Sequence, residues 1–330
     1  MAKQKIVKSD ELIVDNSILS AVARCPTYAY TRYCLGLNVK GESLPLEAGH
    51  AIHLGMELWM QGRGVKVAVK AMADYYERAV TRYLMSIEAD NLPAEDRRMA
   101  PERVISIFTM HLGKLEERWP FKVLKKAIEG PIAAPFGETS VGQPVIYVAR
   151  LDAIVRKWEQ GGKWSLDHKS TRRITDWWQD KQKVSSQWSG QVWLGRQHGV
   201  GELEGVIIHA IELPEPHTSD RTCKEHGVPY TECSIRHATY DYVYVTRSEP
   251  ELAAWELSAR KLVEQYAWLK RLAEKEGIEG IKQVQMNGRF NEGCVFCGFK
   301  DWCRLGRPTG ARQVAATFRT DPWDPRAVKE

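Results

Sequence analysis

The sequence predicts a mixed α/β protein in which one central mixed sheet is flanked by helices. Two observations carry this prediction. Up to about position 120, apolar side chains recur at helical spacing; beyond it, short apolar runs alternate with turn residues and two further amphipathic segments. Because strands and helices follow one another in the second half of the chain, we expect them to share one core.

The first third of the chain is predicted to be helical. Asp15-Asn16-Ser17 is suited to capping a helix, because short polar side chains accept hydrogen bonds from the first free amides. Pro93 and Pro120 stand where helices are expected to end. After an irregular or strand-like leader over residues 1–14, we expect helices over 18–33, 45–61, 65–86 and 102–119, with a polar connector over 37–46.

The remainder of the chain is predicted to form strands and then helices. Residues 123–155 carry short apolar runs with turn signals at Gly130-Pro131, Pro135-Phe136-Gly137 and Gly142-Gln143-Pro144. Further along we expect a strand over 164–170, a helix over 176–199, a buried strand over 206–211, an edge or half-exposed strand over 240–245 and a long helix over 249–276, with a polar excursion over 214–236 and a mobile, proline-bearing end.

Composition limits the class of protein. The 330 residues include 47 Lys and Arg against 42 Asp and Glu, and the net charge of +5 is compatible with a nucleic-acid partner. We find no apolar run long enough to span a bilayer, and the start of the chain is polar rather than secretory, so we expect a cytoplasmic protein. Seven cysteines without a secretion signal favour metal-bound or structural thiols over disulfides.

Two acidic residues interrupt a predicted hairpin. The runs 148–155 and 164–170 flank the turn at Gly161-Gly162, and each contains one aspartate, Asp152 or Asp167. An unpaired carboxylate is expensive to bury in a strand. Because side chains alternate along a strand, Asp167 and Lys169 should share one face. Two converging carboxylates beside an ammonium predict a site for a hard divalent cation, although two surface acids would give the same pattern.

Basic and aromatic residues are interleaved over 156–183. The segment contains Lys157, Lys163, Lys169, Arg172, Arg173 and Lys181 among Trp158, Trp164, Trp177 and Trp178. A groove for single-stranded nucleic acid needs cations for the phosphates and flat rings for the bases. The alternative interpretation is a solvated face over tryptophans that belong to the core.

Three cysteines near the end have the spacing Cys-x2-Cys-x5-Cys, at Cys294, Cys297 and Cys303. Thiolates this close in sequence usually share a metal. An iron–sulfur cubane takes four cysteines, zinc is the competing interpretation, and three buried thiols are the plain alternative. Upstream, Cys223, His226, Cys233 and His237 could form a small zinc site, or this segment could be a flexible insertion over the active site.

The pattern of Asp152 followed by Asp167-x-Lys169 resembles the core of the PD-(D/E)XK nuclease superfamily. With an early cysteine and the late Cys-x2-Cys-x5-Cys, the chain is similar to the RecB-like iron–sulfur branch, which includes CRISPR-adaptation exonucleases and the AddB nuclease domain. The resemblance implies a restriction-endonuclease-like core and a structural [4Fe–4S] cluster on Cys25, Cys294, Cys297 and Cys303, with Cys34 as the alternative to Cys25. The cluster would join the two ends of the chain.

The resemblance also implies roles for individual residues. His53, in Gly49-His50-Ala51-Ile52-His53, matches the family's first motif and would bind Mg²⁺ or Mn²⁺ with Asp152, Asp167 and the peptide carbonyl of His168. Lys169 would orient or deprotonate water, or stabilise the phosphate. Gln187 matches the Gln of a Gln-x3-Tyr motif that contacts DNA, and Gln191 stands where the family has Tyr.

These features predict a metal-dependent DNA nuclease, an exonuclease on single-stranded DNA or duplex ends. We expect one nuclease domain over 1–330, divided into a helical region (15–120), a core (121–275), an iron–sulfur region (276–306) and a tail (307–330). The chain lacks a Walker-type phosphate loop, so a coupled helicase would be another chain. The expected partners are DNA and a separate helicase, recombinase or CRISPR-adaptation protein. The alternative is a non-catalytic DNA-binding or scaffolding subunit with a nuclease-like fold.

Overall fold

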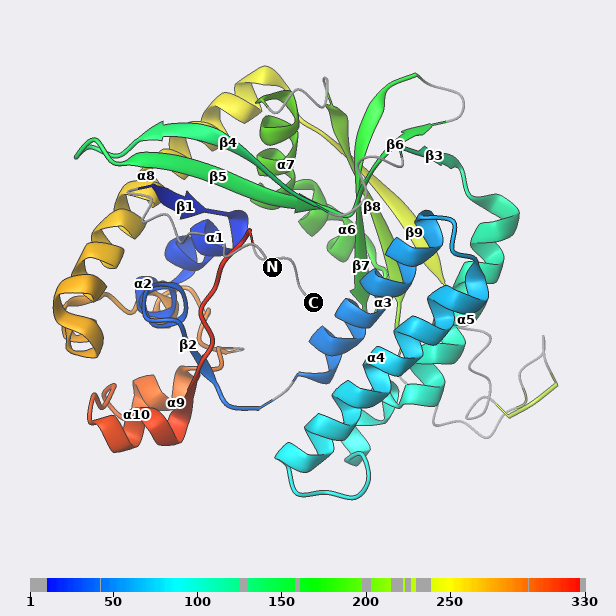
Figure 1. The fold of residues 1–330 in the computed structure, drawn as a ribbon, viewed down its shortest axis with the longest axis horizontal. Helices are drawn as coiled ribbons and strands as arrows, with labels where there is room; N and C mark the ends of the chain where they lie inside the picture. Colours follow the sequence, from blue (N-terminus) through cyan, green and yellow to red (C-terminus); the bar gives the residue numbers. More distant parts are fainter. Residues whose placement is uncertain are drawn as a thin grey trace, which may run out of the picture.

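The described residues fold into three sheets with helices packed around them, so the prediction of one central sheet is wrong in number, although the mixed α/β class holds (Figure 1). A sheet that turns a corner divides into two, because each part must bury a different face. The computed structural model describes residues 11–41, 43–124, 130–157, 161–197, 203–214, 222, 227–229, 239–295 and 297–326.

The largest sheet has five strands in the order β3-β6-β7-β8-β9. Strands β7 and β8 are parallel and the other neighbours are antiparallel, so this sheet is mixed as predicted. β8 is buried along most of its length and β9 lies at the edge, which confirms the two strands predicted there. The strands are β3 (Phe121–Val123), β6 (Ala153–Lys157), β7 (Lys163–Thr171), β8 (Leu203–Glu212) and β9 (Tyr240–Thr246).

A three-stranded sheet adjoins it, in the order β1-β5-β4. β1 (Leu12–Val14) runs parallel to β5 (Pro144–Leu151), and β4 (Gly130–Glu138) is antiparallel to β5. Gly142, with φ +78°, makes the turn of this hairpin, as predicted. The turns predicted at 130–131 and 135–137 are wrong: both lie within β4, where a shift of register accommodates Gly137 at φ +87°.

One residue separates the two sheets. β5 ends at Leu151 and β6 begins at Ala153, so the chain passes from one sheet into the other at Asp152. The sequence predicted a single strand over 148–155, because the apolar pattern continues through the bend. The predicted hairpin with β7 is real, but β6 alone forms it, with Ala153 opposite Leu166.

The helical first third is confirmed, with one interruption. α4 (Val65–Ser86) matches its prediction to the residue. The helix predicted over 18–33 breaks at Cys25, whose extended backbone is followed by Pro26. The segments are α1 (Asn16–Arg24), α2 (Pro26–Ala29), the π-helical turn η1 (Tyr30–Cys34), α3 (Leu44–Met60), α4, the 3₁₀ turn η2 (Ala94–Met99) and α5 (Pro101–Arg118).

The later helices differ from prediction at one point. The helix predicted over 176–199 is two helices, α6 (Asp176–Lys183) and α7 (Ser186–Gln197). The long helix α8 (Glu249–Glu276) is confirmed, with a Ser248–Glu251 capping box at its start. Downstream lie the 3₁₀ turns η5 (Gly277–Gln283) and η6 (Asn287–Arg289), then α9 (Lys300–Arg304) and α10 (Ala311–Thr317).

The end of the chain is ordered against its beginning. β10 (Phe318–Thr320) pairs with β2 (Leu37–Val39), inside the segment predicted to be a polar connector. Arg32 forms an ion pair with Asp321, and Trp323 donates a hydrogen bond to Asp15. The predicted mobile end is therefore wrong for the described residues up to 326.

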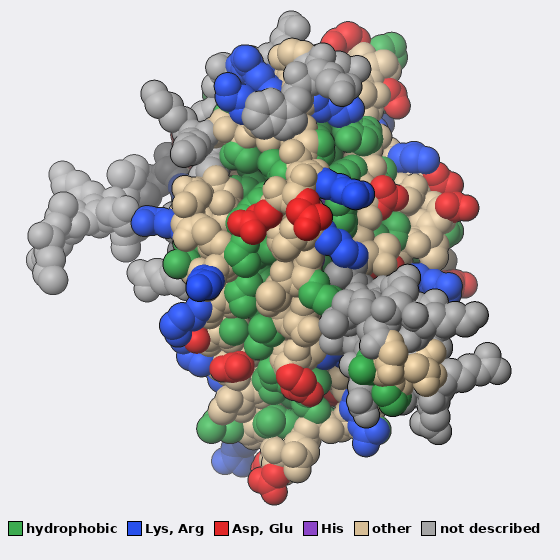
Figure 2. Space-filling model, turned by 90° about the vertical axis from the view of Figure 1, so that its right-hand side faces the viewer, with side chains coloured by type: hydrophobic (Ala, Val, Ile, Leu, Met, Phe, Trp, Pro, Cys, Tyr) green, Lys and Arg blue, Asp and Glu red, His purple; other side chains and the backbone are tan. Residues whose placement is uncertain are grey.

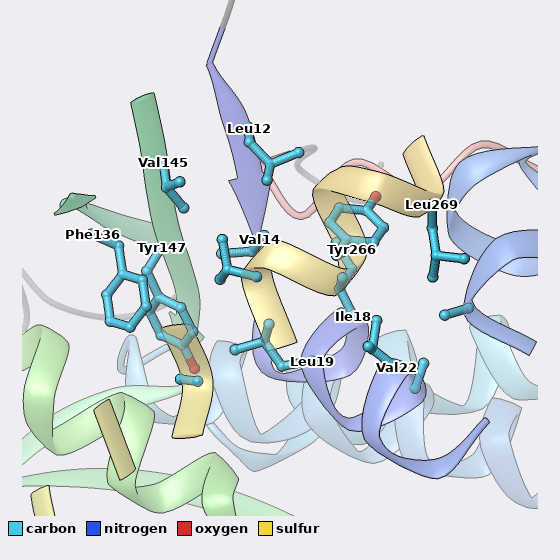
Figure 3. Close-up of a cluster of buried hydrophobic side chains, with 14 of the residues drawn as sticks. Leu12, Val14, Ile18, Leu19, Val22, Phe136, Val145, Tyr147, Tyr266 and Leu269 are labelled. Carbon is cyan, nitrogen blue, oxygen red and sulfur yellow. The ribbon is translucent and has the colours of Figure 1, made fainter. Parts of the chain in front are cut away.

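The main core lies between α8, α1 and the three-stranded sheet. Figure 3 shows side chains of β1, β5, α1 and α8 converging there, among them Val14, Tyr147, Ile18 and Tyr266. A second core joins α3, α4 and α5. At Gly55 of α3, an added Cβ would lie 2.4 Å from Phe108 Cζ, so this glycine lets α3 approach α5 closely. The second core holds α3 in place, and a separate cluster that includes Trp164 and Leu166 holds β7, so both elements of the site are anchored by buried side chains.

The face of the molecule on the right-hand side of Figure 1 has mixed character. Figure 2 shows basic and acidic side chains dispersed among hydrophobic ones on this face. Among the described side chains visible there, the basic ones do not gather into one patch. The positive net charge is therefore not concentrated on this view of the protein.

Candidate active site

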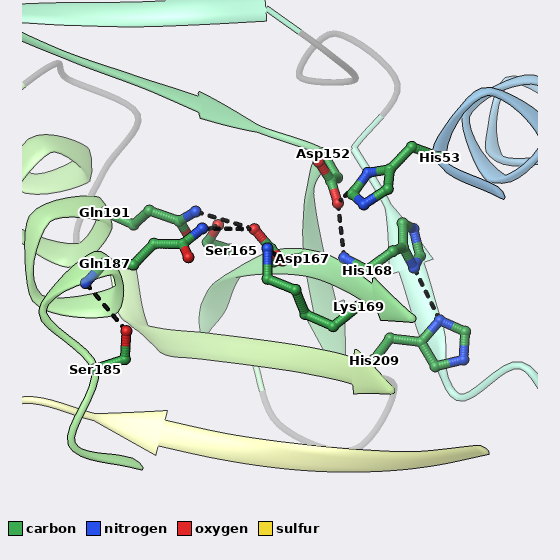
Figure 4. A network of polar contacts seen from close by, with 10 residues as sticks. All are labelled: His53, Asp152, Ser165, Asp167, His168, Lys169, Ser185, Gln187, Gln191 and His209. Carbon is green, nitrogen blue, oxygen red and sulfur yellow. Dashed lines mark hydrogen bonds and ion pairs between the residues drawn. The ribbon is translucent and has the colours of Figure 1, made fainter. Parts of the chain in front are cut away.

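Asp152 lies at the corner where the chain passes between the two sheets. Its Oδ2 accepts a hydrogen bond from the backbone N–H of His168, at 2.7 Å (Figure 4). The bend between β5 and β6 orients this carboxylate toward β7. A residue at the same place in a regular strand would have hydrogen-bonded to its neighbour through the backbone instead. Asp152 is 7% exposed. The corner thus places one acid beside the middle of β7.

Asp167 and Lys169 share one face of β7, as predicted from strand geometry. Lys169 Nζ lies 2.6 Å from Asp167 Oδ2. Asp167 is 3% exposed, and Lys169 Nζ also lies over the ring of Trp188, 5.2 Å from its centroid. The ammonium is therefore held by both an ion pair and a cation–π contact.

Two glutamines of α7 bind the other oxygen of Asp167. The side-chain amides of Gln187 and Gln191 each donate to Asp167 Oδ1, at 3.3 Å. Because the two residues are four apart, they lie on one face of the helix. Ser165 Oγ donates to Gln191 Oε1 at 3.0 Å, which ties this amide back to β7. The sequence prediction included Gln187 and did not assign a contact to Gln191 or Ser165.

His53 approaches from α3. Its Nδ1 lies 3.1 Å from Asp152 Oδ2, and its ring meets the ring of His168 edge to face. His53, Asp152, Asp167, His168, Lys169 and Gln187 therefore converge from α3, the β5–β6 corner, β7 and α7 (Figure 4). The structure brings together all of the residues that the sequence predicted for this site; it does not test their roles.

The charges of this site stabilise one another. Burial alone would raise the pKa of Asp152, but His53, together with His168 and Lys169, outweighs burial, and the pKa lies below its usual range. Burial raises the pKa of Asp167, and the ammonium of Lys169 only partly offsets that rise. Burial would lower the pKa of both His53 and Lys169, but the neighbouring carboxylates raise both. The neighbouring carboxylates therefore favour the cationic forms of His53 and Lys169.

A second group of histidines lies behind the carboxylates. His168 Nδ1 lies 2.9 Å from His209 Nδ1, and the ring of His209 stacks on that of His111 from α5. Burial lowers the pKa of His168 and of His111 to about 3, and that of His209 well below its usual value. These three imidazoles are neutral at pH 7. The sequence alone does not reveal this group, because it does not show that His168 of β7 pairs with His209 of β8.

The donor set suits a hard divalent cation. Carboxylate oxygens, a backbone carbonyl and one imidazole are ligands that Mg²⁺ and Mn²⁺ accept. Asp167 Oδ2 is buried, and among the described residues it accepts no hydrogen bond of regular geometry, its contact being the Lys169 ammonium. The described residues contain no group of three or more His, Cys, Asp and Glu side chains gathered closely enough to hold a metal ion as they stand.

A comparison with family models identifies the family to which the chain belongs. A model described as the PD-(D/E)XK nuclease superfamily matches residues 16–304. This chain is a member of the PD-(D/E)XK nuclease superfamily. Members are generally nucleases and typically use Mg²⁺ or Mn²⁺. The matched span includes every residue of the site in Figure 4.

Two other comparisons add little. A solved structure titled "Crystal structure of SSO0001" is 14% identical, and the match covers 92% of this chain and 89% of that chain with a TM-score of 0.34. No curated protein matches the chain. Within the described ranges, no helix combines the length and the apolar character needed to cross a bilayer.

The four cysteines assigned to a cluster lie away from the carboxylates of this PD-(D/E)XK chain. Cys25, Cys294, Cys297 and Cys303 line one pocket between the α1–α2 junction and the segment 286–303. At Gly288, an added Cβ would lie 3.1 Å from Cys294 Sγ, so the absent side chain leaves room beside the thiols. Burial, followed by the neighbouring thiols, raises the pKa of Cys303 to about 11.

The backbone joins the two ends of the chain at this pocket. Thr27 donates to the carbonyl of Gln285 through both its N–H, at 3.0 Å, and its hydroxyl, at 2.7 Å. Asn291 donates to the carbonyl of Arg24. Cys34, the alternative to Cys25, is not among the residues lining the pocket; burial raises its pKa to about 12. The predicted zinc-site residues Cys223, His226, Cys233 and His237 lie outside the described residues.

Proposed function

We propose that this PD-(D/E)XK chain is a Mg²⁺- or Mn²⁺-dependent deoxyribonuclease, working as an exonuclease on single-stranded DNA or duplex ends. The observation that carries the proposal is the convergence of Asp152 and Asp167 with Lys169 and His53 at a sheet corner. The order of the sequence motifs, which resembles that of CRISPR-adaptation exonucleases, supports the exonuclease assignment. A separate helicase, recombinase or adaptation protein is the partner we propose for it.

Each residue has a distinct task in this proposal. Asp152, Asp167, His53 and the peptide carbonyl of His168 would hold the cation. A divalent cation held there supplies charge stabilisation at the scissile phosphate and makes water more acidic. Gln187 and Gln191 fix the orientation of Asp167 through its Oδ1. The backbone N–H of His168 does the same for Asp152.

Lys169 acts as a cation in this scheme rather than as a base. Its pKa is raised because Asp167 and Asp152 face it, so it keeps its proton at neutral pH. An ammonium fixed beside the carboxylates stabilises the negative charge that develops on the phosphate during hydrolysis. It also donates hydrogen bonds that can orient the attacking water.

We further propose that the cysteine pocket holds a structural [4Fe–4S] cluster. A cubane takes one cysteine for each iron, so its ligands surround a volume instead of meeting at one point. Cys25 comes from the start of the chain and the other three from its end. The cluster would therefore reinforce the joining of the termini within a single nuclease domain. Zinc on the same thiols is the competing occupant.

The activity is tested with end-labelled single- and double-stranded DNA in Mg²⁺ or Mn²⁺. We expect metal-dependent shortening by the wild type, lost in Lys169→Ala and in the Asp152→Asn/Asp167→Asn double variant. Binding without shortening by metal-loaded wild type would overturn the nuclease proposal in favour of a DNA-binding or scaffolding subunit. The cluster is tested separately by iron and zinc analysis and by visible absorbance of an anaerobic preparation.

A further inference from the structure

Helix α6 is connected at both ends to the active site. The chain leaves β7 two residues after Lys169, forms α6 over Asp176–Lys183, and returns at Gln187, whose amide binds Asp167. The segment 172–186 is thus an excursion that starts and finishes beside the reacting groups.

α6 is held firmly although it buries no side chain. Thr175 caps it by accepting a hydrogen bond from Trp178 N–H, and Gln179 donates to Asp241 of the edge strand β9, at 2.8 Å. Arg247 donates to the carbonyls of Lys183 and Ser185 at its far end. A short helix that packs the partly buried Trp178 against the main core and is fixed by hydrogen bonds at three points presents its other side chains in a defined orientation.

The exposed side chains of α6 match a single strand of DNA. Trp177 is 72% exposed, whereas Trp164 and Trp188 nearby are buried in the cores. Lys181 Nζ stands over the Trp177 ring, 5.4 Å from its centroid. Residues 172–183 include four basic and two acidic residues, and the basic ones, all exposed, are Arg172, Arg173, Lys181 and Lys183.

We propose that α6 is a stacking platform for single-stranded DNA, on which one base stacks against Trp177 while Arg172, Arg173 and Lys181 bind the adjoining phosphates. This inference rests on the proposed nuclease function and assigns its substrate site. An exposed ring beside cations is the arrangement that binds bases without reading their sequence. The sequence left two interpretations of the interleaved tryptophans. Trp164 belongs to the core, and in this proposal Trp177 binds nucleic acid.

The platform is tested first by binding, without cleavage, in EDTA. The probe is a fluorescent single-stranded oligonucleotide, and the variants are Trp177→Ala and Trp177→Phe. One base–aromatic stack corresponds to about 5- to 150-fold in affinity. We expect Trp177→Ala to weaken binding by about tenfold or more and Trp177→Phe to retain most of it. Trp268→Ala, which changes a partly exposed tryptophan on α8, is the matched control and should leave binding unchanged.

An oligonucleotide with abasic sites identifies the interaction as stacking. Removal of bases should weaken wild-type binding and have little further effect on Trp177→Ala. Equal losses in both proteins, or unchanged binding by Trp177→Ala, would overturn the platform. In Mg²⁺, the variant should raise KM for single strands and leave kcat near that of the wild type. A wild type that binds DNA through Trp177 but never cleaves it would refute the nuclease and leave the platform standing.

Discussion

Acid should destabilise this protein well above the pH at which its carboxylates titrate. The three buried imidazoles of His111, His168 and His209 are neutral in the folded protein because burial lowers their pKa values. In the unfolded chain each has a pKa of about 6.5. Below that pH the unfolded state binds more protons than the folded state, so the free energy of unfolding falls as pH falls.

The size of the effect follows from the two pKa values. With a folded pKa of about 3, one histidine withholds a proton throughout the window from pH 6.5 to 5. Each pH unit corresponds to about 1.4 kcal/mol, so each histidine lowers the free energy of unfolding by about 2 kcal/mol at pH 5. His111 and His168 together reach about 4 kcal/mol, a large part of the whole stability of many domains, and His209, whose pKa burial also lowers, acts in the same direction.

Two groups of the active site oppose this trend. The pKa values of His53 and Asp167 are raised in the folded state, so both bind protons more tightly there than in the unfolded chain. His53 contributes stability that is fully present below about pH 6.5 and is lost as pH rises through its folded pKa. A single variant is therefore needed to isolate the buried histidines.

His111→Leu provides that test, measured by urea unfolding between pH 5 and 7.5 in EDTA. Both ring nitrogens of His111 are buried and lack a hydrogen-bond partner among the described residues, so the variant should be at least as stable as the wild type at pH 7.5. Its pH slope between pH 6 and 5 should be shallower by about 1.4 kcal/mol per unit.

Phe108→Leu, on the same helix α5, is the control for packing. It removes buried volume and should lower stability equally at every pH, because no titrating group changes. If the free energy of unfolding falls with pH at the same slope in wild type and His111→Leu, the His111 imidazole has the same pKa in the folded and unfolded states. That result would refute the account of a buried neutral cluster.

Four further predictions concern the site and the pocket. Lys169→Met should lower the rate of DNA cleavage by about 10²- to 10⁴-fold while the melting temperature stays near that of the wild type; a variant that melts far lower would show a structural role instead. Gln191→Leu removes an amide donor from Asp167 and should weaken Mn²⁺ binding by about 10- to 100-fold, measured by calorimetry; unchanged affinity would contradict the positioning role. Mn²⁺ binding should release a proton from His53, because a ligating imidazole must be neutral, and the affinity for Mn²⁺ should rise as pH rises toward the raised pKa of that residue. Calorimetry in buffers of different ionisation enthalpy measures the proton release. His53→Gln should abolish this release. Cys303→Ala should lose iron and visible absorbance together; retention of both would place the cluster elsewhere.

Local patterns predicted the long helices well. α4 and α8 match their predicted bounds because one apolar stripe persists over many turns, and Ser248 with Glu251 marks the start of α8 in sequence as well as in structure. The pairing of Asp167 with Lys169 was equally accessible, since it follows from strand alternation alone. Where one element determines a feature, the sequence was sufficient.

Features that depend on two distant elements were missed. The corner at Asp152 was missed because the apolar pattern continues from β5 into β6, and one aspartate between them does not distinguish a corner from a residue within a strand. The contact of Gln191 with Ser165 joins a helix to a strand, and its four-residue spacing from Gln187 was the one hint available. The pairing of β2 with β10 spans nearly the whole chain, so the segment 37–46 looked like a connector.

The buried charges of the site are better explained by chemistry than by folding. Asp152 lies beside His53 and Asp167 beside Lys169, so each carboxylate has its own basic partner within 3.1 Å. Buried ion pairs of this kind rarely add stability, because desolvation cancels much of the attraction, and apolar replacements are often as stable. Two such pairs side by side at a sheet corner are therefore a poor way to build a core. They do provide two carboxylates that stay in place without a metal ion and can coordinate one when it binds.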